Sequence, residues 1–338
     1  MKFLFSADWH LSLYSNDKLH PESKLPERLH YIKNSIIFMC EYARMNGVDV
    51  IVVGGDVFHT KSIIHALAQS ILLDIIRKYD KLKFWILDGN HDVSSRSGTG
   101  ISALKCLDNE PNVQMMHSMK RFDNILFVPF YDKQISDIET TGGYTDGKIN
   151  ILVTHLGLNE AMLNSGISIK ADIGVSDLRQ YDLVLLGHYH QPQQIGNVYY
   201  VGSPIQLNWG EKNDEKRFLI VDSETLSVES VLIEGYKKHI EIELTAETKP
   251  QVIEQANNLI KEGHAVKIIM KEVVDLEGLR EFNTIDQTEK DISNRGINST
   301  MSLDEKMSKY LEIAEIPKEL HGIYMTVGKE IIGDGNNG

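Results

Sequence analysis

The sequence predicts an α/β protein in which two sheets form a sandwich flanked by helices, followed by a small β-α-β domain and a C-terminal helical hairpin. Three observations support this prediction. Apolar, strand-like runs alternate with amphipathic helical stretches over residues 1–235. In the second half of that region strands follow strands directly, which favours two sheets over one parallel sheet. After residue 235 the pattern changes to shorter and more polar elements, which indicates added parts.

The elements of residues 1–235 follow from their apolar patterns. Leu29, Ile32 and Ile36 recur at helical spacing and predict a helix over 27–46, which Gly47 is suited to end. Further helices are predicted at residues 61–79 and 99–107. Short apolar runs predict strands at residues 2–7, 48–53, 84–87, 125–128, 149–153, 183–186, 198–201 and 218–221.

The chain after residue 235 is expected to form two further parts joined by a linker. Residues 236–283 are typical of a β-α-β domain, with strands at 237–244 and 265–270 and a helix at 249–262. The polar stretch 284–300 predicts the linker. Ser302 and Glu305 have the spacing of a helix capping box. They predict a helical segment over 301–333, with helices at 303–315 and 317–331 and a disordered tail at 333–338.

Composition limits the class of protein. With 338 residues, 42% hydrophobic and 25% charged, the chain is typical of a soluble globular protein with more than one part. No apolar run approaches the ~20 residues of a membrane span, and the start is too short for a signal peptide. A cytoplasmic protein is therefore expected. Cys40 and Cys106 lack metal-ligand spacing and are expected to be reduced thiols.

The formal net charge of −13 argues mildly against a nucleic-acid-binding protein, because contacts to phosphates need Lys and Arg. The argument is not decisive, since bound divalent cations and a local basic rim can offset an acidic whole. Nucleic acid therefore stays among the substrates that the composition allows.

Short polar groups stand at the ends of five predicted strands. Alone, each has an ordinary explanation, since Asp-X-His pairs are common and Gly-Asn favours turns. Together they contain six of the thirteen histidines, at strand ends where α/β sites assemble. The groups are Asp8-Trp9-His10, Gly55-Asp56-Val57-Phe58-His59, Gly89-Asn90-His91-Asp92, Thr154-His155 and Gly187-His188-Tyr189-His190.

The mixture of carboxylate, amide and imidazole ligands is the one that a two-metal phosphoesterase needs. Two divalent cations about 3.5–4 Å apart can clamp a phosphodiester and generate a hydroxide. Asp56 is the predicted bridging ligand, because the two preceding glycines let the backbone approach the metals. The other predicted ligands are Asp8, His10 and His190 for one metal, and Asn90, His155 and His188 for the other.

Three further residues are candidates for catalysis. His91 follows a predicted ligand but should point away from the metals, which suits a position near the leaving oxygen or the attacked phosphate. Asp92 is expected to orient His91, and His59 could contact the phosphate.

The five groups resemble the signature of the calcineurin-like metallophosphoesterases. Two features make the chain similar to the SbcD-type nuclease subunits in particular, the family of the meiotic recombination eleven protein, with its phage members. These features are Asp8-Trp9-His10-Leu11, and Gly202-Ser203-Pro204 about a dozen residues after the His-X-His group. The resemblance covers residues 1–235 strongly. It extends more weakly to the β-α-β unit, which resembles the family's DNA-capping domain, and to the final helices, which resemble its ATPase-docking segment.

The resemblance implies two manganese ions, with magnesium as the alternative, and a role for His91 as catalytic acid or transition-state stabiliser. It implies 3′-to-5′ exonuclease action on double-stranded DNA and endonuclease action near ends or on single-stranded DNA. This action would serve recombination and double-strand-break repair, in a bacterial or phage-infected cell, together with an SbcC-type coiled-coil ATPase. Position 59 is His or Asp in such families, so the resemblance leaves the role of His59 open.

A homodimer is also implied, because family members pair through helices of the nuclease domain. Residues 61–79 and 99–107 are the candidates. Ile63, Leu72 and Ile76 lie off the main apolar face and could form a second one, although a helix buried on both sides within one chain would show the same pattern. The C-terminal helices likewise could dock on a partner or pack as a simple hairpin.

Two other functions compete with the nuclease. A protein phosphatase or a small-molecule phosphodiesterase could use the same metal core. Phosphatases of this class typically have Asp-Arg-Gly shortly after the bridging Asp, where this chain has Phe58-His59-Thr60-Lys61. A small-molecule enzyme would not need residues 237–331. A non-catalytic regulatory subunit would be expected to have lost ligands, and no predicted ligand is missing here.

Overall fold

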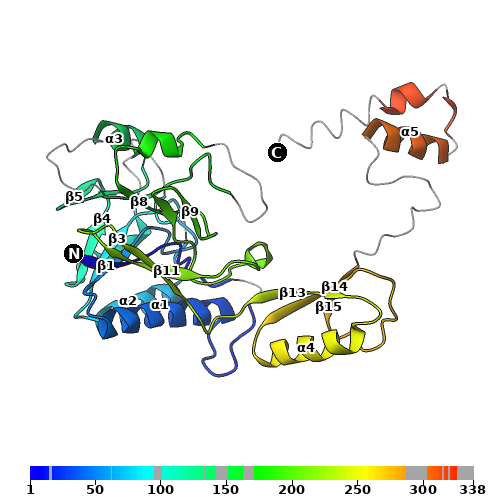
Figure 1. Ribbon diagram of the computed structural model, residues 1–338, viewed down its shortest axis with the longest axis horizontal. Coiled ribbons are helices and arrows are strands. Elements are labelled where there is room, and N and C mark those ends of the chain that lie inside the picture. Colours follow the sequence, from blue (N-terminus) through cyan, green and yellow to red (C-terminus); the bar gives the residue numbers. More distant parts are fainter. Residues whose placement is uncertain are drawn as a thin grey trace. The chain divides into compact units, whose positions relative to one another are not determined.

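The computed structural model divides into two compact units, Met1–Ile240 with Gly263–Ala265, and Glu241–Glu262 with Val266–Gly338 (Figure 1). The residues that the structure describes are 1–14, 17–61, 63–94, 101–131, 134–141, 151–162, 171–286, 303–313, 316–318 and 320–325.

The first sheet of the larger unit has six strands in the order β12–β11–β1–β2–β3–β4. Strands β1 to β4 are parallel to one another, and β11 and β12 add antiparallel pairings at one side. Their bounds are β1 Lys2–Ser6, β2 Val50–Val53, β3 Lys83–Leu87, β4 Val113–Met116, β11 Arg217–Asp222 and β12 Val228–Leu232.

The second sheet also has six strands, in the order β5–β6–β7–β8–β10–β9. The four inner strands are parallel, and β5 and β9 pair antiparallel at the two edges. The two-sheet prediction is therefore confirmed. The bounds are β5 Lys120–Phe122, β6 Ile125–Val128, β7 Ile151–His155, β8 Leu183–Gly187, β9 Gln193–Ile195 and β10 Val198–Tyr200.

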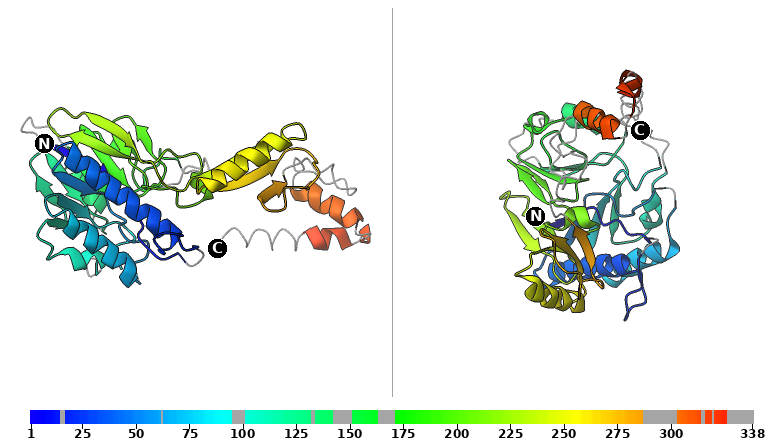
Figure 2. Two further views of the ribbon diagram at one scale, coloured as in Figure 1. Left: turned by 90° about the horizontal axis from the view of Figure 1, so that it is seen from below. Right: turned by 90° about the vertical axis from the view of Figure 1, so that its right-hand side faces the viewer.

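Alternation of side chains along the strands builds a layered core. Phe3 and Phe5 of β1 pack with Phe127 and other residues of the second sheet, between the two sheets. Leu4 faces the other way, into a cluster with α1 (Glu27–Met45) and α2 (Ala66–Lys78), which lie side by side over the first sheet (Figures 1 and 2). Helix α3 (Gln134–Thr141) and η2 (Val175–Leu178) contribute to a third cluster on the outer face of the second sheet.

Several predicted bounds differ from the structure. Helix α1 matches its prediction, and Gly47 follows it with a φ of +65°. Helix α2 begins only at Ala66 rather than at 61. Of the predicted helix 99–107, the described part is a bridge at Ser102 and a 3₁₀ helix, η1 (Ala103–Leu107), in which Ser102 Oγ accepts a hydrogen bond from the Leu104 amide. Strands β4, β5, β9 and β12 were not predicted.

The smaller unit contains the predicted β-α-β elements and an additional strand. The three-stranded sheet has the order β13–β14–β15, and β14 and β15 run parallel. Strand β15 takes up the first residues of the range 284–300 that was expected to be a linker, and the rest of that range lies outside the described residues. The elements are β13 His239–Leu244, α4 Lys249–Lys261, β14 Ala265–Met270, β15 Asn283–Asp286 and α5 Leu303–Ile313.

The second predicted C-terminal helix, 317–331, is seen in part. Residue 318 and residues 320–325 are helical, and the remainder up to residue 338, with the expected disordered tail, lies outside the described residues. Among the described residues, no helix is long and apolar enough to cross a membrane.

Candidate metal centre

The predicted ligands gather at one edge of the sandwich. Strands β1, β2 and β3 are parallel, as are β7 and β8, so their carboxyl ends share an edge within each sheet. The segment that follows β1 and the segment that follows β2 stay hydrogen-bonded to each other beyond the two strands. The Asp8 amide donates to the Gly55 carbonyl (3.0 Å), and the His10 amide donates to the Asp56 carbonyl (3.0 Å). Ligands from distant parts of the sequence are thus held by the sheet itself.

The backbone is strained at four of the predicted ligands. Asp8, His10, Asp56 and His188 have φ values of +54°, +50°, +54° and +102°. Residues with a Cβ pay about 1–2 kcal/mol each for such a conformation, and strain of this kind concentrates at functional sites. Three of these four residues, Asp8, His10 and Asp56, belong to the metal clusters described below.

One cluster is formed by Asp8, His10 and His190, each of which offers a ligand atom within 4.8 Å of the others. The Nε2 atoms of His10 and His190 lie 2.9 Å apart, and His10 Nε2 lies 3.8 Å from Asp56 Oδ2. Two imidazole nitrogens facing each other need a shared proton or a cation between them. This donor set of nitrogen and carboxylate oxygen fits a divalent transition metal.

A second cluster is formed by Asp8, Asp56 and His155. His155 Nε2 lies 3.3 Å from Asp56 Oδ2 and 3.0 Å from Asn90 Oδ1, and His188 Nδ1 lies 2.9 Å from the same amide oxygen. His155 Nδ1 lies 2.8 Å from the Gly54 carbonyl, to which it can donate, leaving Nε2 free to bind a metal. Asp8 belongs to both clusters, and Asp56 Oδ2 lies near a histidine of each, His10 and His155, which suits the bridging position predicted for Asp56.

Burial makes the charged forms of several predicted metal ligands unfavourable when no cation is bound. Asp8 is fully buried, and burial raises the pKa of its carboxyl to about 6. Burial likewise lowers the pKa of His10 well below its usual value and that of His188 to about 3. At other ligands the neighbouring charges outweigh burial. Burial works to raise the pKa of Asp56, but His155 lowers it; burial works to lower the pKa of His155, but Asp56 raises it to about 9. Two divalent cations would supply the positive charge that these buried donors lack.

His91 and His59 lie against the first cluster. Ligand atoms of His10, His59 and His91 come within 4.8 Å of one another, and the rings of His59 and His91 are stacked. His91 Nδ1 lies 2.6 Å from the His59 carbonyl, and the His91 amide donates to Asp56 Oδ1 at 2.8 Å. Donation from Nδ1 to that carbonyl leaves His91 Nε2 for exchange of a proton with a substrate.

Asp92 has a different position from the one expected. It is fully buried, and burial raises its pKa well above the usual value. Its carboxyl accepts hydrogen bonds from the amides of Val57 (3.2 Å), Phe58 (3.0 Å) and Gly89 (2.9 Å). The expectation that Asp92 orients the His91 ring is therefore wrong: the His59 carbonyl has that position, and Asp92 ties the segment after β3 to the segment after β2.

Sequence reasoning missed the support of His190. The His190 Nδ1 atom lies 3.1 Å from Glu211 Oε1. Glu211 is held in turn by the fully buried Lys216, whose Nζ contacts Glu211 Oε2 at 2.7 Å. Lys216 Nζ also contacts Asp214 Oδ2 (3.0 Å) and the His190 carbonyl (2.9 Å). Burial raises the pKa of Glu211, but the hydrogen bond with His190 and the charge of Lys216 lower it to about 2. The one sequence signal was Gly202-Ser203-Pro204, because Ser203 Oγ contacts Glu211 Oε2 at 3.1 Å.

Known nucleases resemble this chain in sequence. It is 25% identical over 244 residues to exonuclease subunit 1 of Enterobacteria phage T4, covering 68% of this chain and 67% of the phage protein. It is 25% and 26% identical to the SbcD subunit of nuclease SbcCD from Staphylococcus epidermidis and from Staphylococcus saprophyticus. These matches cover 66% of this chain in each case, and 66% and 65% of the two relatives. The chain thus spans slightly less than two thirds of the length of the two staphylococcal relatives.

Solved structures of low identity resemble the chain as well. A dimetal phosphatase from Danio rerio is 10% identical with a TM-score of 0.44, covering 69% of this chain and 99% of that one. The calcineurin-like phosphoesterase YfkN from Bacillus subtilis is 13% identical with a TM-score of 0.40, covering 78% and 98%. The family assignment depends instead on sequence, since the model of the calcineurin-like phosphoesterases matches residues 1–192. The chain therefore belongs to the calcineurin-like phosphoesterase family, whose members hydrolyse phosphate esters at a pair of metal ions.

Proposed function

We propose that this protein is a manganese-dependent DNA nuclease that processes DNA ends by 3′-to-5′ exonuclease and single-strand or end-proximal endonuclease action. The observation that carries the proposal is the pair of clusters that share Asp8, with Asp56 near a histidine of each and His91 beside them. Such an arrangement suits phosphodiester hydrolysis, and the relatives named as nucleases support DNA as the substrate.

Each residue has a part in this chemistry. The ligands proposed for the metals are Asp8, His10, Asp56, Asn90, His155, His188 and His190. Two divalent ions held by these residues would stabilise the negative charge of the phosphate and lower the pKa of a water molecule. His91 can donate a proton to the leaving oxygen or stabilise charge on the phosphate, while the His59 carbonyl holds its ring. The His59 ring is half-buried beside Tyr14 and stacked on the His91 ring, a position that supports the proposal that His59 contacts the phosphate.

The proposed partners are double-stranded and single-stranded DNA and an SbcC-type ATPase that binds the C-terminal helices. The relatives named as SbcD subunits of nuclease SbcCD support the ATPase, and they and the phage relative support the cytoplasm of a bacterial or phage-infected cell. A partner with a basic surface would also compensate the net charge of −13 when DNA is held.

Homodimerisation through α2 finds less support than expected. Leu72 and Ile76, which were expected to form a second apolar face, are buried in the core of their own chain. Ile63 is 67% exposed and lies before the helix rather than on it. A homodimer is part of the proposal through the family resemblance, and its contact surface has to be sought outside these two residues.

Manganese-dependent cleavage of duplex and single-stranded DNA by the metal-stripped and reloaded protein tests the proposal. Bis(p-nitrophenyl) phosphate serves as a generic diester control. Manganese-dependent loss of DNA supports the nuclease. Hydrolysis of the control diester with intact DNA, even after the ATPase partner is added, would contradict it and favour a small-molecule phosphodiesterase on the same metal core.

A further inference from the structure

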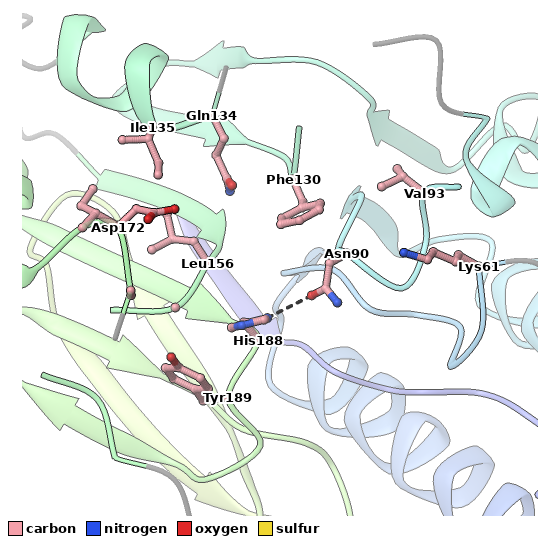
Figure 3. Close-up of a pocket in the computed structure, with 13 residues that line it drawn as sticks. Lys61, Asn90, Val93, Phe130, Gln134, Ile135, Leu156, Asp172, His188 and Tyr189 are labelled. Carbon is pink, nitrogen blue, oxygen red and sulfur yellow. Dashed lines mark hydrogen bonds between the residues drawn. The ribbon is translucent and has the colours of Figure 1, made fainter. Parts of the chain in front are cut away.

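A cavity of about 570 Å³ opens directly beside the second metal cluster (Figure 3). Asn90 and His188, both proposed ligands, form part of its wall. The remaining wall comes from segments after β2, β3, β6, β7 and β8, so the cavity lies at the same edge of the sandwich as the ligands. A phosphate bound at the metals would therefore have this cavity next to it.

The walls of the cavity are mainly apolar and aromatic. Val93, Leu156 and Ile173 are buried, and the rings of Phe130 and Tyr189 lie on different sides of the space (Figure 3). A phosphate group alone gains nothing from such walls, since burying a charge beside apolar groups is unfavourable. The volume is within the range of about 300–1,000 Å³ that is usual for small-molecule sites. The cavity suits a planar, largely apolar group attached to the phosphate.

A few polar groups border the same space. Lys61 is exposed at the side of Asn90, where its charge can attract a phosphate. The Gln134 amide is held by its contacts with Thr154 Oγ1 (2.9 Å) and the His155 carbonyl (2.8 Å), and Asp172 lies across from Lys61 (Figure 3). Apolar walls with few fixed polar groups are the usual composition of a site that takes a heteroaromatic ring.

We propose that this cavity, the base pocket, binds the base of the nucleotide whose phosphate lies at the metal centre. The inference rests on the proposed nuclease function and adds a requirement to it: the base must be unpaired. A base in a duplex is paired and stacked, and reaching a pocket of this kind requires its extrusion, which costs least at frayed ends, mismatches and single strands. The base pocket thus selects for unpaired nucleotides next to the scissile bond.

Equilibrium binding to the manganese-loaded protein tests the base pocket directly. The probes are 2′-deoxyadenosine 5′-monophosphate and 3′-monophosphate, compared with 2-deoxyribose 5-phosphate, which lacks the base, by calorimetry. We expect one of the nucleotides to bind at least about ten-fold more tightly than the sugar phosphate, the gain that base stacking on aromatic rings provides. Equal affinities would overturn the inference.

Two variants test whether the tighter binding of the nucleotide comes from the base pocket. Ile135→Trp, in the first turn of α3, fills the pocket, and Phe130→Ala removes one ring. Both should reduce the advantage of the nucleotide while leaving the affinity for the sugar phosphate unchanged, which also shows that the metal centre is intact. Ile37→Trp, a half-buried position on α1, is the matched control and should change neither affinity. An unchanged advantage in both pocket variants would place the base elsewhere and contradict the proposal.

DNA cleavage separates failure of the base pocket from failure of the nuclease. The substrates are oligonucleotides with a paired end, a mismatched end, or an abasic nucleotide at the cleaved position. Faster cleavage at the mismatched end and slower cleavage at the abasic position are expected. Cleavage at equal rates would refute the base pocket alone, whereas absence of cleavage of every DNA would refute the proposed function.

Discussion

At the scale of single residues, the two metal clusters differ in how their imidazoles are supported. His155 donates to a main-chain carbonyl, that of Gly54, whereas His190 faces the carboxylate of Glu211. A carboxylate partner fixes the tautomer of a ligating histidine and increases its basicity more than a neutral carbonyl does. Lys216 in turn holds Glu211 in place from the interior. The first cluster therefore depends on residues that never touch the metal.

Replacing Glu211 should weaken metal binding without removing a ligand. In Glu211→Gln, His190 loses its charged partner, and we expect a loss of about 10- to 100-fold in manganese affinity, measured by calorimetry. The exposed Glu215→Gln, four residues away, is the control and should bind manganese as the wild type does. Unchanged affinity in Glu211→Gln would show that the contact does not support the metal centre.

The sequence could reveal ligands but not their supports. Asp8 and Asp56 were recognisable because ligand residue types stand directly after apolar strands. Glu211 stands in no such position, and its partner His190 is 21 residues away, so only the folded chain brings them together. Asp92 was assigned to its neighbour His91 because adjacency in sequence does not show which way a buried carboxyl points.

At the scale of elements, the turn after β2 brings the backbone close to the metal centre. Gly55 has a φ of +94°, and a Cβ there would lie 2.7 Å from His155 Nδ1 and 2.8 Å from the Gly89 Cα. Gly47 after α1 has a φ of +65°, but a Cβ there would meet nothing within 4 Å. The two positions share a left-handed conformation and differ in crowding, which makes them a matched pair.

Gly47→Ala and Gly55→Ala should therefore have different consequences. Gly47→Ala should cost only the strain of the left-handed conformation, about 1–2 kcal/mol, and leave manganese binding unchanged. Gly55→Ala should cost more and also reduce manganese affinity, because His155 has to move. Denaturant unfolding and calorimetry give both quantities, and equal effects at the two positions would argue against close packing at this turn.

A charged cluster joins the end of β3 to η1 and β4 outside the metal centre. His117 lies 2.6 Å from Asp88 and 2.9 Å from Asp108, and the hydrogen bond to Asp88 raises the pKa of His117 to about 9. Its protonated form stabilises the fold fully below about pH 6.5, the usual value for histidine, and this contribution is lost as the pH rises through about 9.

The difference in unfolding free energy between wild type and His117→Asn should therefore depend on pH. We expect it to be larger at about pH 6 than at about pH 10, by about 1 kcal/mol because the ring is partly exposed. His65→Asn provides a control for the loss of a histidine outside this cluster. Denaturant unfolding of the metal-free protein measures the difference, and a constant value across this range would contradict the charged pairing.

Long periodic elements were predictable, and short ones were not. The stripe of Leu29, Ile32 and Ile36 identified α1, whereas β5 and β9 have three residues each, too few to show a pattern. The two apolar faces of α2 were visible in the sequence, but periodicity cannot tell a face that meets a partner from one that meets the same chain. Burial of Leu72 and Ile76 decides for the same chain.

At the scale of the whole molecule, the chain carries its ligands in one compact unit and its C-terminal helices in the other. All predicted ligands lie between Asp8 and His190, so the smaller unit supplies none of them. Helix α5 has exposed Tyr310, and Ile323 and Tyr324 beyond it are also exposed. Exposed apolar groups on short helices are consistent with docking on a partner.

Removal of residues 301–338 should separate DNA cleavage from binding of the ATPase partner. The shortened protein should retain manganese-dependent cleavage of DNA, because every proposed ligand remains, and should lose binding to the SbcC-type ATPase in pull-down experiments. Retained binding would refute the role of the C-terminal helices, and lost cleavage would show that the metal centre needs them.

Cleavage by the wild type and by His91→Ala tests the central claim most directly. Duplex DNA labelled at the 3′ or the 5′ end is incubated with manganese, with bis(p-nitrophenyl) phosphate as control, and manganese binding is measured for both proteins. We predict that the wild type degrades the DNA and that His91→Ala binds manganese but is slower by about 10²–10⁴-fold. Undiminished DNA cleavage by His91→Ala, or hydrolysis of the control diester with DNA intact, would contradict the account.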